Sequence, residues 1–324
     1  MSKIQKALAM LRNGGDTSAA DERPGAPSEG STDESRVQAT AEANASRDSV
    51  VRSRRRYIAE DVLVDEQPPS FSITVDIKEL QDQGLHPRDD DLDLVRQEFR
   101  RIKRPILNAA FTDAGAGEDD ANVIMMTSAL PKSGKTFCSF NLAMSIARER
   151  DVGAVIVDAD VLKPNASRAL GLEDRVGLID YLLDSSVTLD DILVGTDLYD
   201  IVVVPAGRQH EEATELLASR RMKQLIHALS ERYNTRAIIV DTPPLLLTNE
   251  AHVLMENMGQ IVLVVEAGES SQESTVQALS SLDRSKPINA ILNKTRIASL
   301  DYTGSEYGYY SAPERGYRYG KEKG

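Results

Sequence analysis

The sequence predicts a doubly wound α/β fold, with a mostly parallel sheet and helices on both of its faces. Short, strongly apolar runs alternate with helical patterns from residue 122 to residue 294. The apolar runs are continuous rather than alternating in hydrophobicity, which is typical of strands buried on both faces of a parallel sheet. Regular alternation of strands with helices favours the same architecture. Ligands bind beyond the carboxyl ends of such strands, so the residues after each strand are expected to carry the function.

The expected elements follow from these patterns. A short strand and a turn of helix are expected within residues 71–85, and a helix from Asp91 to about Ala110 with an interruption at Pro105. The later strands are expected at residues 122–128, 153–160, 201–207, 236–244, 260–268 and 289–294. The later helices are expected at residues 136–150, 216–233 and 272–285.

The chain divides into four segments. Residues 1–12 place apolar side chains at helical spacing and predict a short amphipathic helix, either without a role or as a docking peptide. Residues 13–70 contain too few apolar side chains to offset the entropy of ordering, so a disordered linker is expected. Residues 71–300, including the 91–110 helix, form the predicted folded domain, and residues 301–324 form a flexible tail.

Composition limits the classes of function. The 324 residues carry a formal net charge of −13, which argues against general nucleic-acid binding because that function needs a basic surface. Cys138 is the only cysteine, so no intramolecular disulfide is expected and a reducing compartment fits best. Neither a signal peptide nor an apolar run of about 18–20 residues is evident. A cytoplasmic protein is therefore expected, with any membrane association made through a partner.

A candidate phosphate-binding loop follows the strand at 122–128. Gly134, Lys135 and Thr136 fit the end of the pattern GxxxxGK[ST] between a strand and a helix, whereas Ala129 stands where the pattern has its first glycine. Loop N–H groups and the helix N-terminus would face phosphate, with Lys135 on the β- and γ-phosphates and the Thr136 hydroxyl on Mg²⁺. A chance match at a helix start is the alternative, but the strand and helix on either side argue against it.

Carboxylates follow two further strands. Asp158 and Asp160 end one apolar run, and Asp241 ends another. A carboxylate at the end of a hydrophobic strand is the Walker B arrangement, which holds Mg²⁺ or its water shell. Any one of these residues alone could instead cap a helix. All three together with the phosphate loop predict a nucleotide and Mg²⁺ site.

The last 23 residues are unusually rich in tyrosine. They contain six of the ten tyrosines and have no apolar periodicity, so they do not form a core element. The six are Tyr302, Tyr307, Tyr309, Tyr310, Tyr317 and Tyr319. The segment is either a set of modification sites or an adhesive low-complexity tail.

These features resemble the bacterial tyrosine kinases (BY-kinases), a branch of the MinD/ParA-like P-loop proteins, over about residues 92–320. Residues 131–136 (PKSGKT) look like the family's phosphate loop, residues 158–160 (DAD) like its Walker A′ motif, and residues 241–244 (DTPP) like its Walker B motif. Residues 1–11 and 98–108 are similar to the autokinases found with exopolysaccharide and exosortase systems.

The family's E-x-x-R-x-x-R motif, known for assembling subunits into rings, is matched by Glu98, Arg101 and Arg104. Spacing alone also fits an exposed helix face with a Glu–Arg pair. The sequence departs from the family at Lys132, where the family usually has glycine, and at Leu162, where it often has arginine.

The resemblance implies a protein-tyrosine autokinase that uses ATP and Mg²⁺ to phosphorylate its own tail, in trans within a ring, and regulates exopolysaccharide synthesis or export. It implies Lys135, Asp158, Asp160 and Asp241 as catalytic, with Asp160 as the base and Thr136, Asp158 and Asp241 on the metal. The implied nucleotide contacts are Pro131, Lys132, Ser133, Gly134, Lys135, Thr136 and Phe137, with Asn293 on adenine.

The implied partners are other copies of the chain, a separate membrane-bound activator of the polysaccharide chain-length type, and a tyrosine phosphatase, but no nucleic acid. The kinase is then expected at the inner face of the plasma membrane, held there by its activator. Two other hypotheses are consistent with the same ATP site. They are a MinD/ParA-like ATPase switch and a non-catalytic ATP-binding scaffold of a polysaccharide export complex.

Overall fold

The computed structural model describes residues 68–111 and 120–295, so the predicted N-terminal helix, most of the predicted linker and the tyrosine-rich tail lie outside the described residues. The strands are β1 (Phe71–Ile73), β2 (Val123–Ser128), β3 (Gly153–Asp158), β4 (Val194–Thr196), β5 (Ile201–Val204), β6 (Arg236–Asp241), β7 (Gln260–Glu266) and β8 (Ile288–Asn293). The longer helices are α4 (Asp89–Phe111), α5 (Lys135–Ile146), α10 (Arg220–Arg232) and α12 (Gln272–Ser281). The shorter ones are α3 (Ile77–Asp82), α6 (Asn165–Ala169), α7 (Leu178–Leu183), α8 (Leu189–Ile192), α9 (Ala213–Leu217) and α11 (Glu250–Met255).

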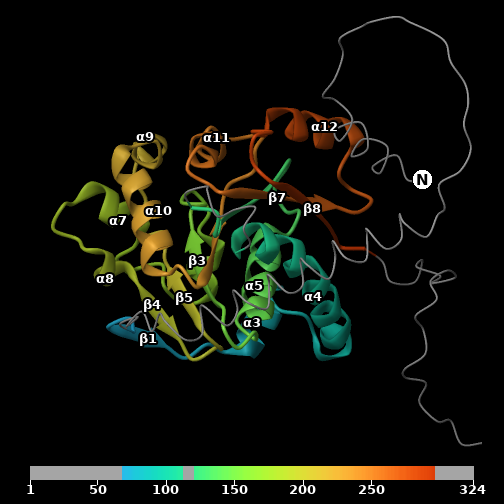
Figure 1. The fold of residues 1–324 in the computed structure, drawn as a ribbon, viewed down its shortest axis with the longest axis horizontal. Helices are drawn as coiled ribbons and strands as arrows, with labels where there is room; N and C mark the ends of the chain where they lie inside the picture. The colour runs from blue at the N-terminus through green and yellow to red at the C-terminus, as the bar shows by residue number, and fades with distance from the viewer. Residues whose placement is uncertain (1–67, 112–119, 296–324) are drawn as a thin grey trace, which may run out of the picture. The chain divides into compact units, whose positions relative to one another are not determined.

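The described strands form one sheet in the order β1-β4-β5-β3-β6-β2-β7-β8 (Figure 1). Neighbouring strands run parallel except β4 and β5, which are antiparallel. The predicted doubly wound, mostly parallel α/β fold is confirmed.

Each central strand sends alternate side chains to two hydrophobic cores. On β3, Val155 and Val157 belong to the core beneath α7, α9, α10, α11 and α12. Ala154 and Ile156 on the same strand belong to the opposite core, beneath α4, α5 and α6. Burial on both faces is why the strands read as continuous apolar runs in the sequence.

Several predicted boundaries were wrong. The helix expected at 216–233 is two helices, because Ser219 caps α10 by accepting a hydrogen bond from the Met222 N–H at 3.2 Å. α4 runs through Pro105 without the expected interruption. Proline lacks a backbone N–H and so removes one donor from the helix ladder, but buried Lys103 and Ile106 keep the helix packed on the domain.

The sequence analysis did not predict several short elements, because their residues show no periodic hydrophobicity. β4, α6, α7, α8 and α11 contain three to six residues each, too few to display a helical or strand repeat. The predicted helices at 136–150 and 272–285 end early, at Ile146 and Ser281. Across the described part of the chain, every helix is too short or too polar to span a lipid bilayer.

The strand order sets the place of the site. β3, β6 and β2 are adjacent and parallel, with Asp158 paired in register with Asp241 and Met126 paired with Asp241 on its other side. The loop after β2 and both aspartates therefore meet at the carboxyl edge of the sheet.

Candidate functional site

The loop from Ala129 to Gly134 joins β2 to α5, as the phosphate-loop pattern predicts. Gly134 precedes α5 with φ +89°, in the left-handed region. A Cβ at this position would lie 2.2 Å from Asn293 Nδ2, so a side chain would clash as well as strain the backbone. Glycine is thus required here for the loop to turn beneath the end of β8.

Ser133, which the sequence analysis named as a nucleotide contact, and three side chains that it did not name (Ser128, Glu266 and Lys294) hold the loop in shape. Ser128 Oγ and Ser133 Oγ both donate hydrogen bonds to the Leu130 carbonyl, at 2.6 and 3.0 Å. Lys294 Nζ donates to the Lys132 carbonyl at 2.7 Å and pairs with Glu266 at 2.8 Å. These contacts tie the phosphate loop to the ends of β2, β7 and β8. The only sequence signal for them was their position directly after a strand.

Lys132 adopts φ +66°, in the left-handed region that favours glycine. This is the position where BY-kinases usually have glycine. The loop therefore keeps the backbone turn with a residue that strains it, at a cost of about 1–2 kcal/mol.

Lys135 is buried at the start of α5, with a residue exposure of 8%. Its charge lowers the pKa values of both Asp160 and Asp241. Burial nevertheless raises the pKa of Asp241 to about 6, a shift that Lys135 and hydrogen bonds from Thr136 and Ser139 only partly offset. Ser139 Oγ lies 3.3 Å from Asp241 Oδ1. The structure thus places Lys135, Thr136 and Asp241 in one group, as predicted from the sequence.

Asp158 is wholly buried beside Asp241. Burial, and then the charge of Asp241, raise its pKa to about 8, although two hydrogen bonds from Ser167 oppose the shift. The backbone N–H and the hydroxyl of Ser167 both donate to Asp158 Oδ2, each at 2.7 Å. Asp158 Oδ1 has no hydrogen-bond partner within residues 68–111 and 120–295. One carboxylate oxygen is therefore left for another ligand.

This donor set fits Mg²⁺. A buried carboxylate oxygen without a partner, a second carboxylate beside it and the Thr136 hydroxyl are all hard oxygen ligands. No cluster of three or more His, Cys, Asp or Glu side chains in the described ranges is arranged as a metal cage. Mg²⁺ does not require one, because it uses one or two carboxylates together with waters and substrate phosphates.

Asp160 follows β3 and is half-buried. Its carboxylate accepts a hydrogen bond from the Lys163 N–H at 3.3 Å. Burial raises its pKa, opposed by the charge of Lys135, the bond from Lys163 and the Lys163 charge. A carboxyl group beside Lys135 of the phosphate loop, with a raised pKa, is suited to accept a proton.

Two predicted nucleotide contacts have structural roles in this conformation. Asn293 Nδ2 donates to the Ser133 carbonyl at 2.9 Å, which fixes the loop from above. Phe137 packs edge-on against Phe99, with ring centroids 6.3 Å apart. The predicted contacts of Asn293 with adenine and of Phe137 with nucleotide stay predictions.

The predicted oligomerisation residues lie on α4, away from the phosphate loop. Glu98, Arg101 and Arg104 are exposed, and Arg101 pairs with Glu98 at 3.3 Å along the helix. Their predicted role at an interface stays a prediction. The six predicted tail tyrosines lie outside the described residues.

No family model matches the chain. Over 193 residues it is 32% identical to tyrosine-protein kinase YwqD of Bacillus subtilis, covering 59% of this chain and 78% of that protein. Over 228 residues it is 27% identical to the putative tyrosine-protein kinase CapB of Staphylococcus aureus, covering 70% of this chain and 94% of that protein.

Solved kinase domains share the fold. The VpsO kinase domain superposes with a TM-score of 0.54 at 25% identity, covering 64% of this chain and all of that domain. The kinase domain of the Escherichia coli tyrosine kinase ETK superposes with a TM-score of 0.52, also at 25% identity. That match covers 76% of this chain and 97% of the ETK domain.

The left-handed backbone at Lys132 predicts that a glycine variant is more stable than an alanine variant at this position, the reverse of the usual order. Lys132→Gly should be more stable than Lys132→Ala by about 1 kcal/mol, because only glycine adopts φ +66° without strain. Thermal melting of both variants measures the difference. The same pair at exposed Leu130, whose φ is not positive, should show the usual order with alanine the more stable. Alanine above glycine at both positions would contradict the assigned loop conformation.

The buried carboxyl of Asp158 predicts a pH-dependent gain from Asp158→Asn in the metal-free protein. An unfolded aspartate has a pKa near 3.9, whereas burial raises the folded pKa of Asp158 to about 8. Its contribution to stability is therefore complete below about pH 4 and is lost as the pH rises towards 8. Asparagine does not ionise, so the variant should melt above the parent near pH 8, with the difference shrinking towards pH 4.

Melting curves in chelator from pH 4 to pH 8 measure this difference. Asp283→Asn is the matched control, because hydrogen bonds from Ser285 lower the pKa of exposed Asp283 and reverse the sign. A constant melting difference across the pH range for Asp158→Asn would contradict the buried, protonated carboxyl.

Proposed function

The chain belongs to the bacterial tyrosine-protein kinases, and we propose that it transfers the γ-phosphate of ATP to tyrosines in its own C-terminal segment. The observation that carries the proposal is the meeting of the phosphate loop with two buried carboxylates at the ends of three adjacent strands. The six tyrosines at positions 302–319 are the proposed acceptors.

The chain's own residues divide the work of phosphoryl transfer. Lys135 and the loop N–H groups hold the phosphates, and Thr136, Asp158 and Asp241 hold Mg²⁺, which neutralises phosphate charge when bound. Asp160 accepts the proton of the attacking tyrosine hydroxyl, whose ordinary pKa is near 10. The raised pKa of Asp160 makes it a stronger base than an ordinary carboxylate.

The proposed reaction runs between copies of the chain. Glu98, Arg101 and Arg104 lie on exposed positions of α4, where a neighbouring subunit can reach them. A ring assembled through this motif would present the tail of one subunit to the site of the next.

The proposed setting is the control of exopolysaccharide synthesis or export. It is supported by the similarity of residues 1–11 and 98–108 to autokinases of such systems. A membrane-bound chain-length-type activator would hold the kinase at the inner face of the membrane, and a tyrosine phosphatase would reset it. Crosslinking in cells followed by mass spectrometry tests the partner. Recovery of no membrane protein would count against this setting.

Mass spectrometry of the purified protein after incubation with Mg·ATP tests the kinase. We expect phosphate on tyrosines 302–319, none in Lys135→Ala, and a rate about 10²–10⁴-fold lower in Asp160→Asn, which cannot accept the proton. Circular dichroism establishes that both variants remain folded. ATP hydrolysis without tail phosphate would instead indicate an ATPase switch, and ATP binding without turnover a scaffold.

Sedimentation velocity and the concentration dependence of autophosphorylation test the ring. In Arg101→Ala/Arg104→Ala we expect loss of the oligomer, together with loss of the rise in specific activity at higher protein concentration. Arg284→Ala is the control, since Arg284 is an exposed arginine in the loop before β8. An unchanged oligomer and unchanged activity in the double variant would rule out this interface.

A further inference from the structure

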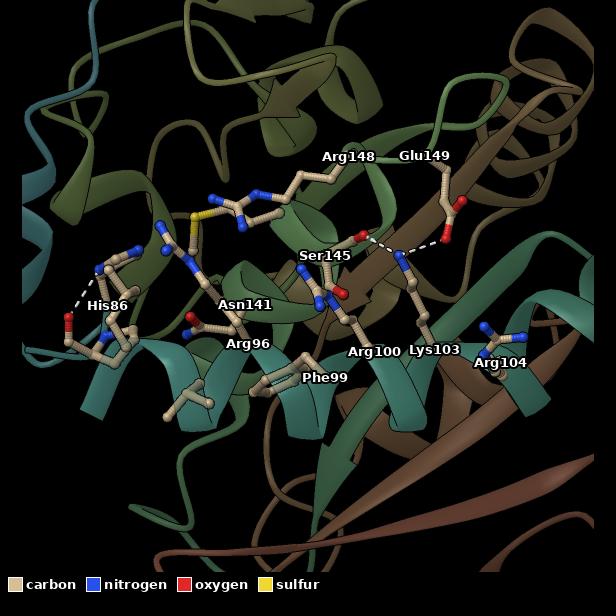
Figure 2. Close-up of a pocket in the computed structure, with 14 residues that line it drawn as sticks. His86, Arg96, Phe99, Arg100, Lys103, Arg104, Asn141, Ser145, Arg148 and Glu149 are labelled. Carbon is tan, nitrogen blue, oxygen red and sulfur yellow. Dashed lines mark hydrogen bonds and ion pairs between the residues drawn. The ribbon is translucent and has the colours of Figure 1, made fainter. Parts of the chain in front are cut away.

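A cleft of about 230 Å³ lies between α4 and the C-terminal half of α5, apart from the phosphate loop (Figure 2). The phosphate loop lies at the other end of α5, and Ser145 in the cleft is ten residues from Lys135, or roughly 15 Å along the helix. The charged side chains that line the cleft are Arg96, Arg100, Lys103, Arg104, Arg148 and Glu149, and His86 is beside them.

The charges of the cleft do not cancel. Lys103 pairs with Glu149 at 2.8 Å and also donates to the Ser145 carbonyl at the end of α5, so these two charges balance each other. Four arginines remain. In a chain with a net charge of −13, such a concentration of cations indicates a site for an anion.

The four arginines are weakly committed to other partners. Arg96 pairs at 3.6 Å with Asp93, whose side chain is 93% exposed, so solvent screens that pair. Arg148 lies over the Tyr199 ring, 4.7 Å from its centroid, and donates a hydrogen bond to the Tyr199 hydroxyl, so its partner is uncharged. Arg100 and Arg104 have no acidic partner in the described ranges. Figure 2 shows Arg96 and Arg100 pointing from α4 toward the end of α5, where Arg148 lies.

His86 reports the same positive potential. Burial is the main cause that lowers its pKa, and the charges of Arg96 and Arg148 lower it further. A hydrogen bond with the Pro87 carbonyl at 3.0 Å opposes these effects. The imidazole is therefore held in its neutral form among the arginines.

The remaining walls are apolar. Leu92, Val95 and Phe99 come from α4, Met144 comes from α5, and Pro87 precedes α4. The volume is below the roughly 300–1,000 Å³ of sites for drug-sized ligands, so it suits one side chain rather than a nucleotide. A phosphorylated aromatic side chain matches both the apolar wall and the arginines of the cleft. Its ring would contact the apolar wall, and its phosphate would accept hydrogen bonds from the arginines.

We propose that this cleft binds a phosphotyrosine side chain from the C-terminal segment of this kinase. The source of the phosphate rests on the proposed autokinase function, but the cleft itself does not. Tyrosines 302–319 follow Lys294 by 8 to 25 residues, and an extended chain spans roughly 3.3–3.6 Å per residue, so the last of them can lie up to roughly 80 Å from Lys294. Each phosphate adds about −1.5 to −2 charges, which complements the four arginines.

Docking would separate product from the catalytic crevice. A tail held in the cleft by one phosphotyrosine keeps that product about a helix length away from the phosphate loop. The crevice then stays open for the next unmodified tyrosine.

Fluorescence anisotropy with labelled synthetic peptides of residues 301–319 tests the proposal. The peptides are unmodified, phosphorylated on Tyr309 and Tyr310, or phosphorylated on Ser311. The protein is the full chain, treated with phosphatase and then kept free of Mg·ATP. We expect the phosphotyrosine peptide to bind at least about tenfold tighter than the other two.

Substitutions locate the binding site. Arg96→Gln/Arg100→Gln and the single Arg100→Gln should weaken the phosphotyrosine peptide, by at least about tenfold for the pair, because charge-assisted hydrogen bonds are lost. Arg284→Gln is the control, because it removes the same single charge as Arg100→Gln but lies in an exposed loop. It should leave binding of the phosphotyrosine peptide unchanged. Thermal melting establishes that the variants fold.

Three outcomes would overturn the proposal. The first is equal binding of all three peptides. The second is full competition by inorganic phosphate at the concentration of the phosphopeptide. The third is that Mg·ADP abolishes binding of the phosphotyrosine peptide to the parent protein, whereas the Arg96 and Arg100 substitutions leave binding unchanged. The last would place the peptide in the catalytic crevice. Because the peptides are synthetic, binding without autophosphorylation would contradict the proposed function alone, and autophosphorylation without binding would contradict the cleft alone.

Discussion

The candidate site is built around two carboxyl groups buried side by side at the ends of adjacent strands. Asp158 and Asp241 are partners across β3 and β6, and burial raises the pKa of both. Isolated buried charges are costly, so the surrounding groups must offset them. Ser167, Lys135 and the hydroxyls beside Asp241 do so only in part. The folded protein therefore gives up stability to keep these carboxyl oxygens together at the proposed metal site, a common cost of function.

The backbone of the phosphate loop likewise loses stability to keep the shape of the site. Its turn needs left-handed residues at 132 and 134, and only one of the two is glycine. The strain at Lys132 is held by contacts from the end of β8, where Lys294 binds the Lys132 carbonyl and Asn293 binds that of Ser133. Local strain of this kind persists because the surrounding structure over-determines it.

α4 serves two surfaces. Its buried residues Phe99, Lys103 and Ile106 attach it to the domain, and Lys103 also satisfies a carbonyl at the end of α5. Glu98 and Arg101 face outward as an ion pair, whereas Arg96 and Arg100 line the cleft with Arg148. One helix thus supplies both the motif assigned to assembly and the arginines assigned to the phosphotyrosine cleft, and Arg104 belongs to both sets.

The sequence by itself determined the class of fold, the positions of the main strands along the chain, the phosphate-loop pattern and the carboxylates that follow the strands. These are local signals, because an apolar strand and the GKT sequence or aspartate that follows it can be recognised in a short stretch of sequence. It did not determine that α4 continues through Pro105, nor that Ser219 divides one expected helix into two. Tertiary packing decided the first point, because the buried residues of α4 hold a helix that proline would otherwise break. The second point rests on a local N-cap bond from the Met222 N–H to Ser219, which the apolar pattern does not display.

The tertiary structure alone also brought together groups far apart in the chain. Lys294 lies 162 residues beyond Lys132, and Arg148 lies 52 residues beyond Arg96. Charge clusters and hydrogen bonds across such separations leave no periodic trace in a sequence. Their existence depends on strand order and helix packing, which the chain specifies only through the whole set of buried contacts.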